Sequence, residues 1–294
     1  MEELSRGLVK KNHLVLVYGP EGVGKTTFAS GFPDPAFIGS ENGSSHLDVK
    51  RFPEIKNWNH FMTRLDDIAT GKYKDAFKTL VIDSIDWLEP ILFESITEGK
   101  CPIEVACGSF GKWVGEVNNH YRRVMMRLTK IREFNHVVIL AHSQLIKFGD
   151  VINNESYDRY QLKLHSQKSS ALWKEYVDCM LLINHDVSVK KDKNGQVKTY
   201  GEGERIIHTE HRASFDAKNR FNLPSEIVYD LATGTKPFLE LSDAYFCDYE
   251  VMLKQLLPSL DDDTSAKVMN FIASKPSRAA LETAYNKLKQ RIKE

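Results

Sequence analysis

The stretch His13–Thr27 reads HLVLVYGPEGVGKTT, an apolar run that passes directly into a glycine-rich turn. Val and Leu dominate its first six residues, which predicts a buried β-strand. The segment 19–26 then satisfies the pattern G-x-x-x-x-G-K-[ST], and a helix is expected from about Gly24. Glycines let consecutive backbone N–H groups point inward around phosphates, and the helix N-terminus adds the positive end of its dipole. The stretch therefore predicts a phosphate-binding loop.

This loop is expected to bind a nucleoside triphosphate, and we predict ATP with Mg²⁺. Lys25 would reach the β- and γ-phosphates, the Thr26 hydroxyl would bind Mg²⁺, and Thr27 would contact the α-phosphate. No guanine-reading N-K-x-D motif is present, which favours adenine over guanine. The residues predicted to contact the nucleotide are Gly19, Pro20, Glu21, Gly22, Val23, Gly24, Lys25, Thr26 and Thr27.

Composition points to a soluble globular protein. The apolar share of the 294 residues is 41%, the charged share is 27%, and forty basic residues balance forty acidic ones. No run approaches ~18 apolar residues, so no membrane span is expected. The N-terminus lacks the apolar centre of a signal peptide, which predicts a cytoplasmic protein, in the host cytoplasm if phage-encoded. The four cysteines form no C-x-x-C pair, so free thiols are expected.

Strand-like and helix-like segments alternate over the first half of the chain. Apolar strands are expected at 36–39, 79–83 and 136–141, and helices at 57–70, 84–97 and along a long amphipathic stretch before the last strand. This alternation predicts an α/β fold, with a mostly parallel sheet flanked by helices.

The character of the sequence changes after Gln144. The segment 145–165 is polar and without a clear period, and two later strands are expected to join at Asn194–Gly195. Three short helices are expected in the last fifty residues. We therefore predict an ATPase core over 1–244 and a small helical appendage over 245–294.

Polar residues follow three of the expected strands, at the sheet edge where ligands of parallel sheets bind. Asp83 is predicted to hold Mg²⁺ through water. Glu41 is predicted to act as general base on the attacking water, with a solvated loop carboxylate as the alternative. His142 or Gln144 is expected to sense the γ-phosphate, with a polar capping cluster as the alternative.

Together these residues resemble the RecA-like P-loop ATPases, over about 14–224. The resemblance is strongest to phage RecA-like ATPases linked to single-strand annealing and recombination. It implies that Glu41 is the catalytic glutamate and that Gln144 couples nucleotide state to a DNA-binding loop. On the same resemblance, 98–111 and 145–165 would be the first and second DNA-binding loops.

A second match is Lys218-Asn-Arg-Phe221, which resembles the K-N-R-F-G motif of RadA-type and ring-helicase relatives. In those relatives the Lys and Arg reach the neighbouring subunit's ATP site, so Lys218 and Arg220 are implied catalytic residues in trans. Here Asn222 replaces the Gly, and Asn tolerates a left-handed backbone. The alternative is a solvated basic turn.

Two functions follow as hypotheses. The first is a slow, DNA-dependent ATPase that assembles as a ring or filament on single-stranded DNA. A single-strand-binding protein is a further candidate partner, and no membrane partner is expected. Cations interleaved with Tyr157 and Tyr160 in the 145–165 segment suit single strands. The second is a nucleotide-dependent adaptor or helicase loader whose C-terminal helices bind a replication protein. A metabolic nucleotide kinase is disfavoured because no lid arginines are evident.

Overall fold

The computed structural model describes residues 9–39, 43–107, 111–150, 155–186, 188–191, 197–200, 203–247, 249–274 and 276–293. These residues separate into two compact units, one of Lys10–Ser242 and one that holds Asp243–Glu294.

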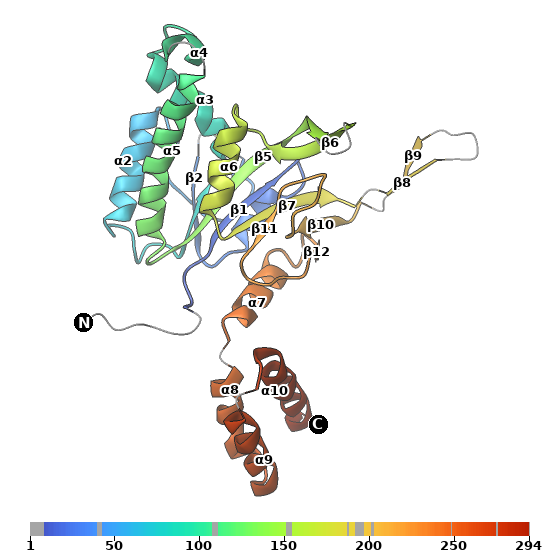
Figure 1. Ribbon diagram of the computed structural model, residues 1–294. Helices are drawn as coiled ribbons and strands as arrows, with labels where there is room; N and C mark the ends of the chain where they lie inside the picture. The colour runs from blue at the N-terminus through green and yellow to red at the C-terminus, as the bar shows by residue number, and fades with distance from the viewer. Residues whose placement is uncertain are drawn as a thin grey trace. The chain divides into compact units, whose positions relative to one another are not determined.

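A ten-stranded mixed sheet forms the centre of the larger unit, counted over the described residues, with strand order β12-β10-β7-β1-β5-β4-β2-β3 (Figure 1). The central strands β7, β1, β5, β4, β2 and β3 run parallel. Antiparallel strands are added by β10, β12, β11 and β6. The strands are β1 (Leu14–Gly19), β2 (Pro35–Ile38), β3 (Lys50–Arg51), β4 (Thr79–Ile82), β5 (His136–Asp150), β6 (Glu155–Leu162), β7 (Cys179–His185), β10 (Arg205–His208), β11 (Lys218–Asn219) and β12 (Glu226–Tyr229).

Helices cover both faces of this sheet. Their bounds are α1 (Lys25–Ser30), α2 (Trp58–Ala69), α3 (Ile85–Thr97), α4 (Ile103–Ala106), α5 (Lys112–Ile131), α6 (Gln167–Tyr176) and α7 (Lys236–Tyr245). In Figure 1, α2, α5 and α6 lie side by side over one face, where a single apolar cluster joins them to the strands. On the other face, the ring of Phe238 from α7 packs against Phe28 of α1 at 5.6 Å between centroids. The predicted α/β class is therefore confirmed.

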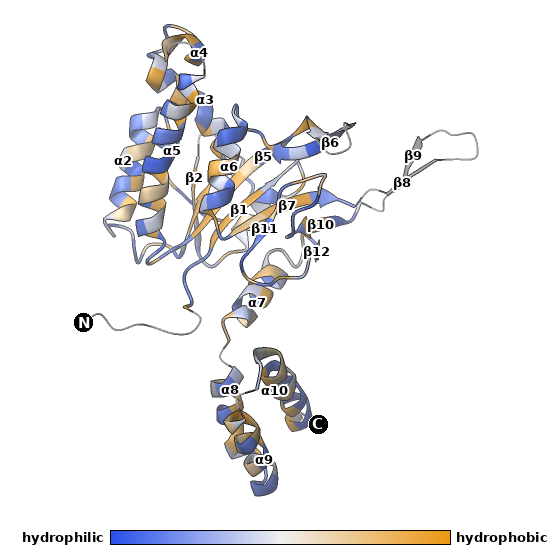
Figure 2. Cartoon of the chain, in the orientation of Figure 1, coloured by the Kyte–Doolittle hydropathy of each residue, from blue (hydrophilic) through white to orange (hydrophobic). Residues whose placement is uncertain are grey.

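Burial of the central strands explains their composition. All six residues of β1 and all four of β4 are buried, because helices shield both faces. Figure 2 shows the hydrophobic residues gathered on these central strands. Helix α2 begins where Asn57 accepts a hydrogen bond from the His60 N–H at 2.9 Å, so a local cap fixes the predicted start of this helix.

The segment 145–165 differs from its prediction as a polar stretch without regular structure. β5 continues past its buried part to Asp150 and pairs with β6 in register from Ser143↔Leu162 to Asp150↔Glu155. This hairpin extends beyond the core of the sheet in Figure 1. Exposed and half-buried residues alternate from Leu145 to Gly149, but the segment as a whole is mostly polar, so hydrophobic periodicity did not reveal the hairpin.

Several further elements were not predicted. They are helix α6, which follows the hairpin, helix α7, whose last residues belong to the smaller unit, the short helix α4, and the strands β3, β11 and β12. The predicted pair of late strands is present as β7 with β10, extended by the shorter pair β8 (Ser188–Lys191) and β9 (Val197–Tyr200). The predicted turn at Asn194–Gly195 lies outside the described residues.

The smaller unit is helical, as expected. It contains α8 (Tyr249–Leu256), a 3₁₀ turn (Leu257–Ser259), α9 (Asp262–Ala273) and α10 (Arg278–Lys293). Its own apolar core consists of Tyr249, Leu253, Val268, Ile272, Tyr285 and Leu288. None of the helices in the described part of the chain is long and apolar enough to cross a membrane.

Candidate nucleotide-binding site

The turn between β1 and α1 has the backbone form that a phosphate cradle requires. Gly22 has φ +72° and Gly24 has φ +98°, conformations that side-chain-bearing residues adopt only with strain. Helix α1 begins at Lys25, directly after this turn, so its first N–H groups face the same space. The loop predicted from the sequence is therefore in the position expected for binding phosphates.

Lys25 is buried against the loop that precedes it. Its ammonium group donates hydrogen bonds to the carbonyl oxygens of Gly19 at 3.0 Å and Pro20 at 2.8 Å, and only 7% of the residue is exposed. A cation beside the backbone N–H groups of a glycine-rich loop adds positive potential to the volume that the loop encloses. This arrangement is suited to a polyanion.

Thr26 and Asp83 are in contact at the carboxyl ends of the parallel strands. The Thr26 hydroxyl donates a hydrogen bond to Asp83 Oδ2 at 3.1 Å, although 57 positions separate them in the sequence. β4 ends at Ile82 and places Asp83 directly beyond it. A hydroxyl and a carboxylate at this separation are hard oxygen ligands of the kind Mg²⁺ prefers, so both residues fit a magnesium site beside the phosphates.

Gly39 allows the end of β2 to pass close to this pair. A Cβ atom at Gly39 would lie 2.0 Å from the carbonyl oxygen of Asp83, a separation that no side chain tolerates. The glycine is therefore required for β2 and the Asp83 turn to approach each other.

A pocket of about 300 Å³ lies above the loop. The residues that line it are Glu21, Gly22, Gly24, Lys25, Thr26, Thr27, Gly43, His46, Asp83 and His142. Most of the predicted nucleotide contacts and both predicted magnesium ligands thus surround one volume. Gly19 lies beneath it as the carbonyl partner of Lys25.

His142 enters this pocket from β5 and is held by a buried carboxylate. Its Nδ1 lies 2.8 Å from Asp86 Oδ2, and its backbone N–H donates to Asp86 Oδ1 at 3.0 Å. The side chain of Asp86 is only 4% exposed. Burial alone would raise the pKa of Asp86, but the bonds from His142 outweigh burial and lower it. Asp86 therefore fixes the orientation of the imidazole that lines the pocket.

Gln144 is placed differently. Its side-chain amide donates to the carbonyl oxygens of Leu162 and Leu164, each at 3.1 Å, and it does not line the pocket. Gln144 thus joins β5 to the end of the hairpin, while His142 is the residue of this pair that reaches the pocket.

We expect Asp86→Asn to lower the free energy of unfolding by about 1–3 kcal/mol at neutral pH, the usual range for a buried charged hydrogen bond. The folded pKa of Asp86 lies below its ordinary value of 3.8, so its stabilisation is complete above that pH. The contribution is lost as the pH falls through the folded pKa. Denaturant titrations of both proteins between pH 7 and pH 3 measure this difference.

The exposed Asp75 provides the matched control, because Asp75→Asn removes one carboxylate without touching the site. A stability difference between wild type and Asp86→Asn that grows toward acid pH would contradict the assignment.

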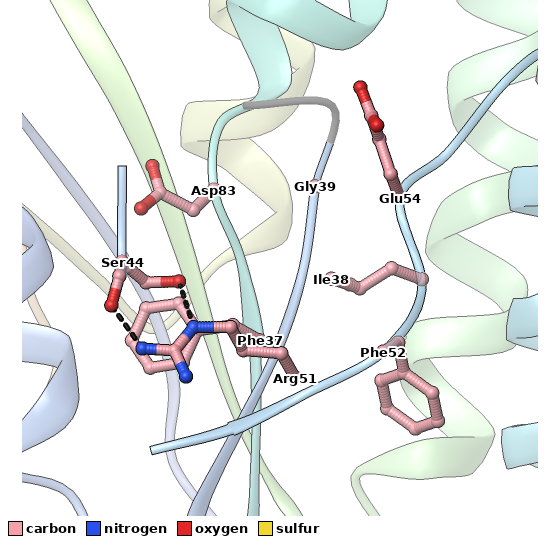
Figure 3. A pocket seen from close by; sticks show the side chains of 8 residues that line it. All are labelled: Phe37, Ile38, Gly39, Ser44, Arg51, Phe52, Glu54 and Asp83. Atoms are coloured by element: carbon pink, nitrogen blue, oxygen red, sulfur yellow. Dashed lines mark hydrogen bonds between the residues drawn. The ribbon is translucent and has the colours of Figure 1, made fainter. Parts of the chain in front are cut away.

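Glu41, the predicted general base, lies outside the described residues. A second hollow of about 310 Å³ adjoins Asp83 and is lined by Phe37, Ile38, Gly39, Ser44, Arg51, Phe52, Glu54 and Asp83 (Figure 3). Arg51 donates from Nε to the Ser44 hydroxyl at 2.9 Å, which secures the chain between β2 and β3. Glu54 is therefore a second carboxylate on a hollow beside Asp83, and the sequence offered no motif that singles it out.

Lys218 and Arg220 lie at the amino ends of the parallel strands, whereas the phosphate loop lies at their carboxyl ends. Strand β11 pairs with the first residues of β7, where Lys218 is opposite Met180, and the phosphate loop follows the last residue of β1. Arg220 donates to Asp178 Oδ1 at 3.1 Å and its side chain is 57% exposed. Asn222 has φ +50°, so the expected left-handed turn is confirmed. These cations therefore lie away from the phosphate loop of their own chain.

The cations of the hairpin region divide into two kinds. Arg159 is buried and donates to Asp216 Oδ1 at 2.7 Å, so it stabilises the fold. Lys147, Lys163 and Lys168 are exposed. The other expected DNA-binding loop contains α4, and its residues 108–110 lie outside the described part.

The comparisons with known proteins agree with this site. A family model described as an AAA domain matches residues 11–221. The chain belongs to this AAA-domain family. Family membership, together with the loop, makes the protein a nucleotide-binding P-loop ATPase. A search of the curated proteins found no match.

Solved structures give weaker likenesses. The RadB recombinase shares 15% identity over 69% of this chain and 83% of its own, with a TM-score of 0.36. The flagellar accessory protein FlaH from Methanocaldococcus jannaschii shares 10% identity over 74% of this chain and 85% of its own, also with a TM-score of 0.36.

The described part of the chain includes all four cysteines, and no disulfide joins them there. Among the described residues, no group of three or more His, Cys, Asp or Glu side chains is placed to hold a metal ion.

Proposed function

We propose that this AAA-domain protein is a Mg²⁺-dependent ATPase that acts on single-stranded DNA in phage-type recombination or annealing. In this proposal, the ATP site is completed by a neighbouring copy of the chain. Lys25 and the loop N–H groups would bind the phosphates, and Thr26 and Asp83 would hold a Mg²⁺ ion that supplies positive charge beside them.

The course of strand β5 is the observation that carries the DNA part of the proposal. One continuous strand brings His142 to the nucleotide pocket and then forms half of the projecting hairpin. The hairpin base is tied to the core a second time, because Glu89 Oε2 accepts the His165 N–H at 2.8 Å. A change in contact between His142 and the γ-phosphate would thus act on the hairpin through a single rigid element.

The exposed side chains of this region suit a single strand. Lys147 and Lys163 offer charge for phosphates, and the partly exposed rings of Tyr157 and Tyr160 offer faces for bases. The buried Arg159 is excluded from this role by its bond to Asp216. The proposed DNA surface is therefore smaller than the charge count of the segment suggested.

The position of Lys218 and Arg220 supports completion of the site in trans. In this conformation Lys218 donates to the carbonyl oxygens of Lys174 and Glu175, at 2.9 and 2.8 Å, near the end of α6. Both cations lie at the amino ends of the parallel strands, away from the phosphate loop of their own chain. The side chain of Arg220 is exposed enough to reach a second molecule. Cations placed in trans stabilise charge on the transferring phosphoryl group, which makes hydrolysis depend on assembly.

Two measurements on the full chain test this function. ATP hydrolysis is expected to be slow without DNA and to rise when single-stranded DNA is added, together with a larger particle mass. Arg220→Ala is expected to lower the stimulated rate by about 100-fold or more, because fingers supplied in trans contribute about 10³–10⁵ in kcat. Arg122→Ala, on the exposed side of α5, is the matched control.

Mixing variants separates a trans site from a cis one. Lys25→Ala and Arg220→Ala should each be inactive alone. Their mixture should regain activity, because some interfaces combine an intact loop with an intact finger. A strictly monomeric enzyme that is fully active at all concentrations would contradict the trans role.

A nucleotide-dependent adaptor or helicase loader is the second candidate. It is favoured by the separate helical unit 243–294, which has its own apolar core and thus the independence of a partner-binding module. Titration of labelled single-stranded DNA with and without ATP, at stated salt, distinguishes the two functions. Absence of binding at low salt favours the adaptor.

A further inference from the structure

The turn that follows β12 lies directly against the phosphate loop. A Cβ atom placed on Gly24 would lie 2.8 Å from Leu231 Cδ2 and 3.2 Å from Tyr229 Cε1. The Tyr229 hydroxyl donates to the Gly24 carbonyl oxygen at 2.9 Å. Two side chains from the far end of the core, about two hundred positions away in sequence, therefore cover the last glycine of the loop.

This turn is held rigidly at both ends. Asp230 Oδ1 accepts the Ala232 N–H at 2.9 Å, and the Asp230 carbonyl accepts the Gly234 N–H at 2.8 Å. The Thr235 hydroxyl donates to the Phe28 carbonyl oxygen of α1. Leu231 is thus fixed beside the loop, yet it is 42% exposed. An apolar side chain that is held in place and left open to solvent beside a binding loop is suited to covering an apolar ligand surface.

The order of strands in the sheet indicates which end of a bound nucleotide would lie near Leu231. Asp83 follows β4 and His142 lies on β5, and both strands are on one side of β1. β7, β10 and β12 lie on the other side of β1. Magnesium ligands mark the β- and γ-phosphate end, so the base end of a bound nucleotide points toward the β12 side.

We propose that Leu231, backed by the ring of Tyr229, is the platform for the nucleobase. This inference rests on the nucleotide-binding function proposed above. Tyr229 is only 2% exposed and its hydroxyl donates to Gly24, so the surface open to the base is the apolar side chain of Leu231. It therefore recognises the face of the base, and the larger face of a purine gains more from it than that of a pyrimidine.

Calorimetric titration with two ligands tests the platform. Mg·ATP carries a base and Mg·tripolyphosphate does not, so wild type should bind Mg·ATP more tightly. Leu231→Ala should weaken Mg·ATP binding by roughly tenfold, the loss expected for one or two buried methylene equivalents, and leave tripolyphosphate binding unchanged. Wild type should also bind ATP more tightly than CTP, and this preference should shrink in Leu231→Ala.

Two control variants accompany this test. Leu241→Ala removes a similarly exposed leucine from α7 and should change neither ligand. Leu231→Met keeps the apolar surface and should retain most of the ATP affinity. Thermal melting of each variant verifies that it is folded.

The outcomes distinguish the platform from the function on which it rests. If wild type binds neither ligand, the nucleotide-binding function fails. If wild type binds both ligands equally, or if Leu231→Ala weakens both by the same factor, only the base platform is overturned. An equal loss for both ligands would show that Leu231 supports the loop and does not contact the base.

Discussion

Replacing Lys25 with Ala is expected to weaken ATP binding by at least about 100-fold and to abolish hydrolysis. The ammonium group is the charged centre of the loop, and charge-assisted hydrogen bonds contribute about 1.5–3 kcal/mol each, or about tenfold per 1.4 kcal/mol. More than one such bond to the β- and γ-phosphates is lost together. Equilibrium binding of ATP and steady-state hydrolysis measure the two losses.

Lys25 also bonds to its own loop, so a folding defect must be separated from a binding defect. The carbonyl oxygens of Gly19 and Pro20 lose their donor in Lys25→Ala. Lys25→Met retains most of the side-chain volume, and Lys56→Ala removes an exposed lysine as the matched control. A Lys25 variant that melts like wild type and still binds and hydrolyses ATP normally would refute the nucleotide-binding assignment.

Asp83→Asn is expected to produce the second large loss, about 1,000-fold in kcat, with a much smaller effect on nucleotide affinity. Removing a preorganised group that stabilises developing charge typically costs about 10²–10³, and loss of a metal adds to it. The amide oxygen of Asn can still accept the Thr26 hydrogen bond, so the geometry of the pair is retained while its charge is removed. Hydrolysis measured over a range of Mg²⁺ concentrations tests this.

The dependence of the hydrolysis rate on Mg²⁺ concentration tests whether Asp83 acts through the metal. Asp83→Asn should require a higher Mg²⁺ concentration for half-maximal rate, and chelation by EDTA should inactivate wild type. The control Asp75→Asn, which removes an exposed carboxylate, should behave as wild type. An unchanged magnesium dependence in Asp83→Asn would remove this residue from the metal site.

Strand β5 contributes both to the nucleotide pocket and to the hairpin, so in the proposed function it would link nucleotide state to DNA. His142 of β5 lines the pocket, and Gln144, two residues further on, donates to the carbonyl oxygens of Leu162 and Leu164. Neighbouring residues on one strand point to opposite sides, but residues two apart share a side. In the proposed function, a shift of His142 on binding of the γ-phosphate would therefore move Gln144 on the same side of the strand.

Much of the α/β core could be predicted because its signals are local. The apolar runs of β1, β4 and the first part of β5 predict buried parallel strands, and Asn57 indicates the start of α2. The hairpin was not predicted, because the segment 145–165 is mostly polar and its sequence shows no clear hydrophobic period. Helices α6 and α7 were missed for a related reason, because few of their residues are apolar and buried.

By itself, the sequence determined the phosphate loop, because the geometry of that loop depends on glycine spacing within nine consecutive residues. Only the tertiary structure decided which distant side chains meet there. The order of the strands places Asp86 beside His142 and Leu231 beside Gly24. It also places Arg220 at the amino ends of the parallel strands, away from the phosphate loop. Strand order arises from how whole elements pack, and the periodicity of any one segment does not contain it.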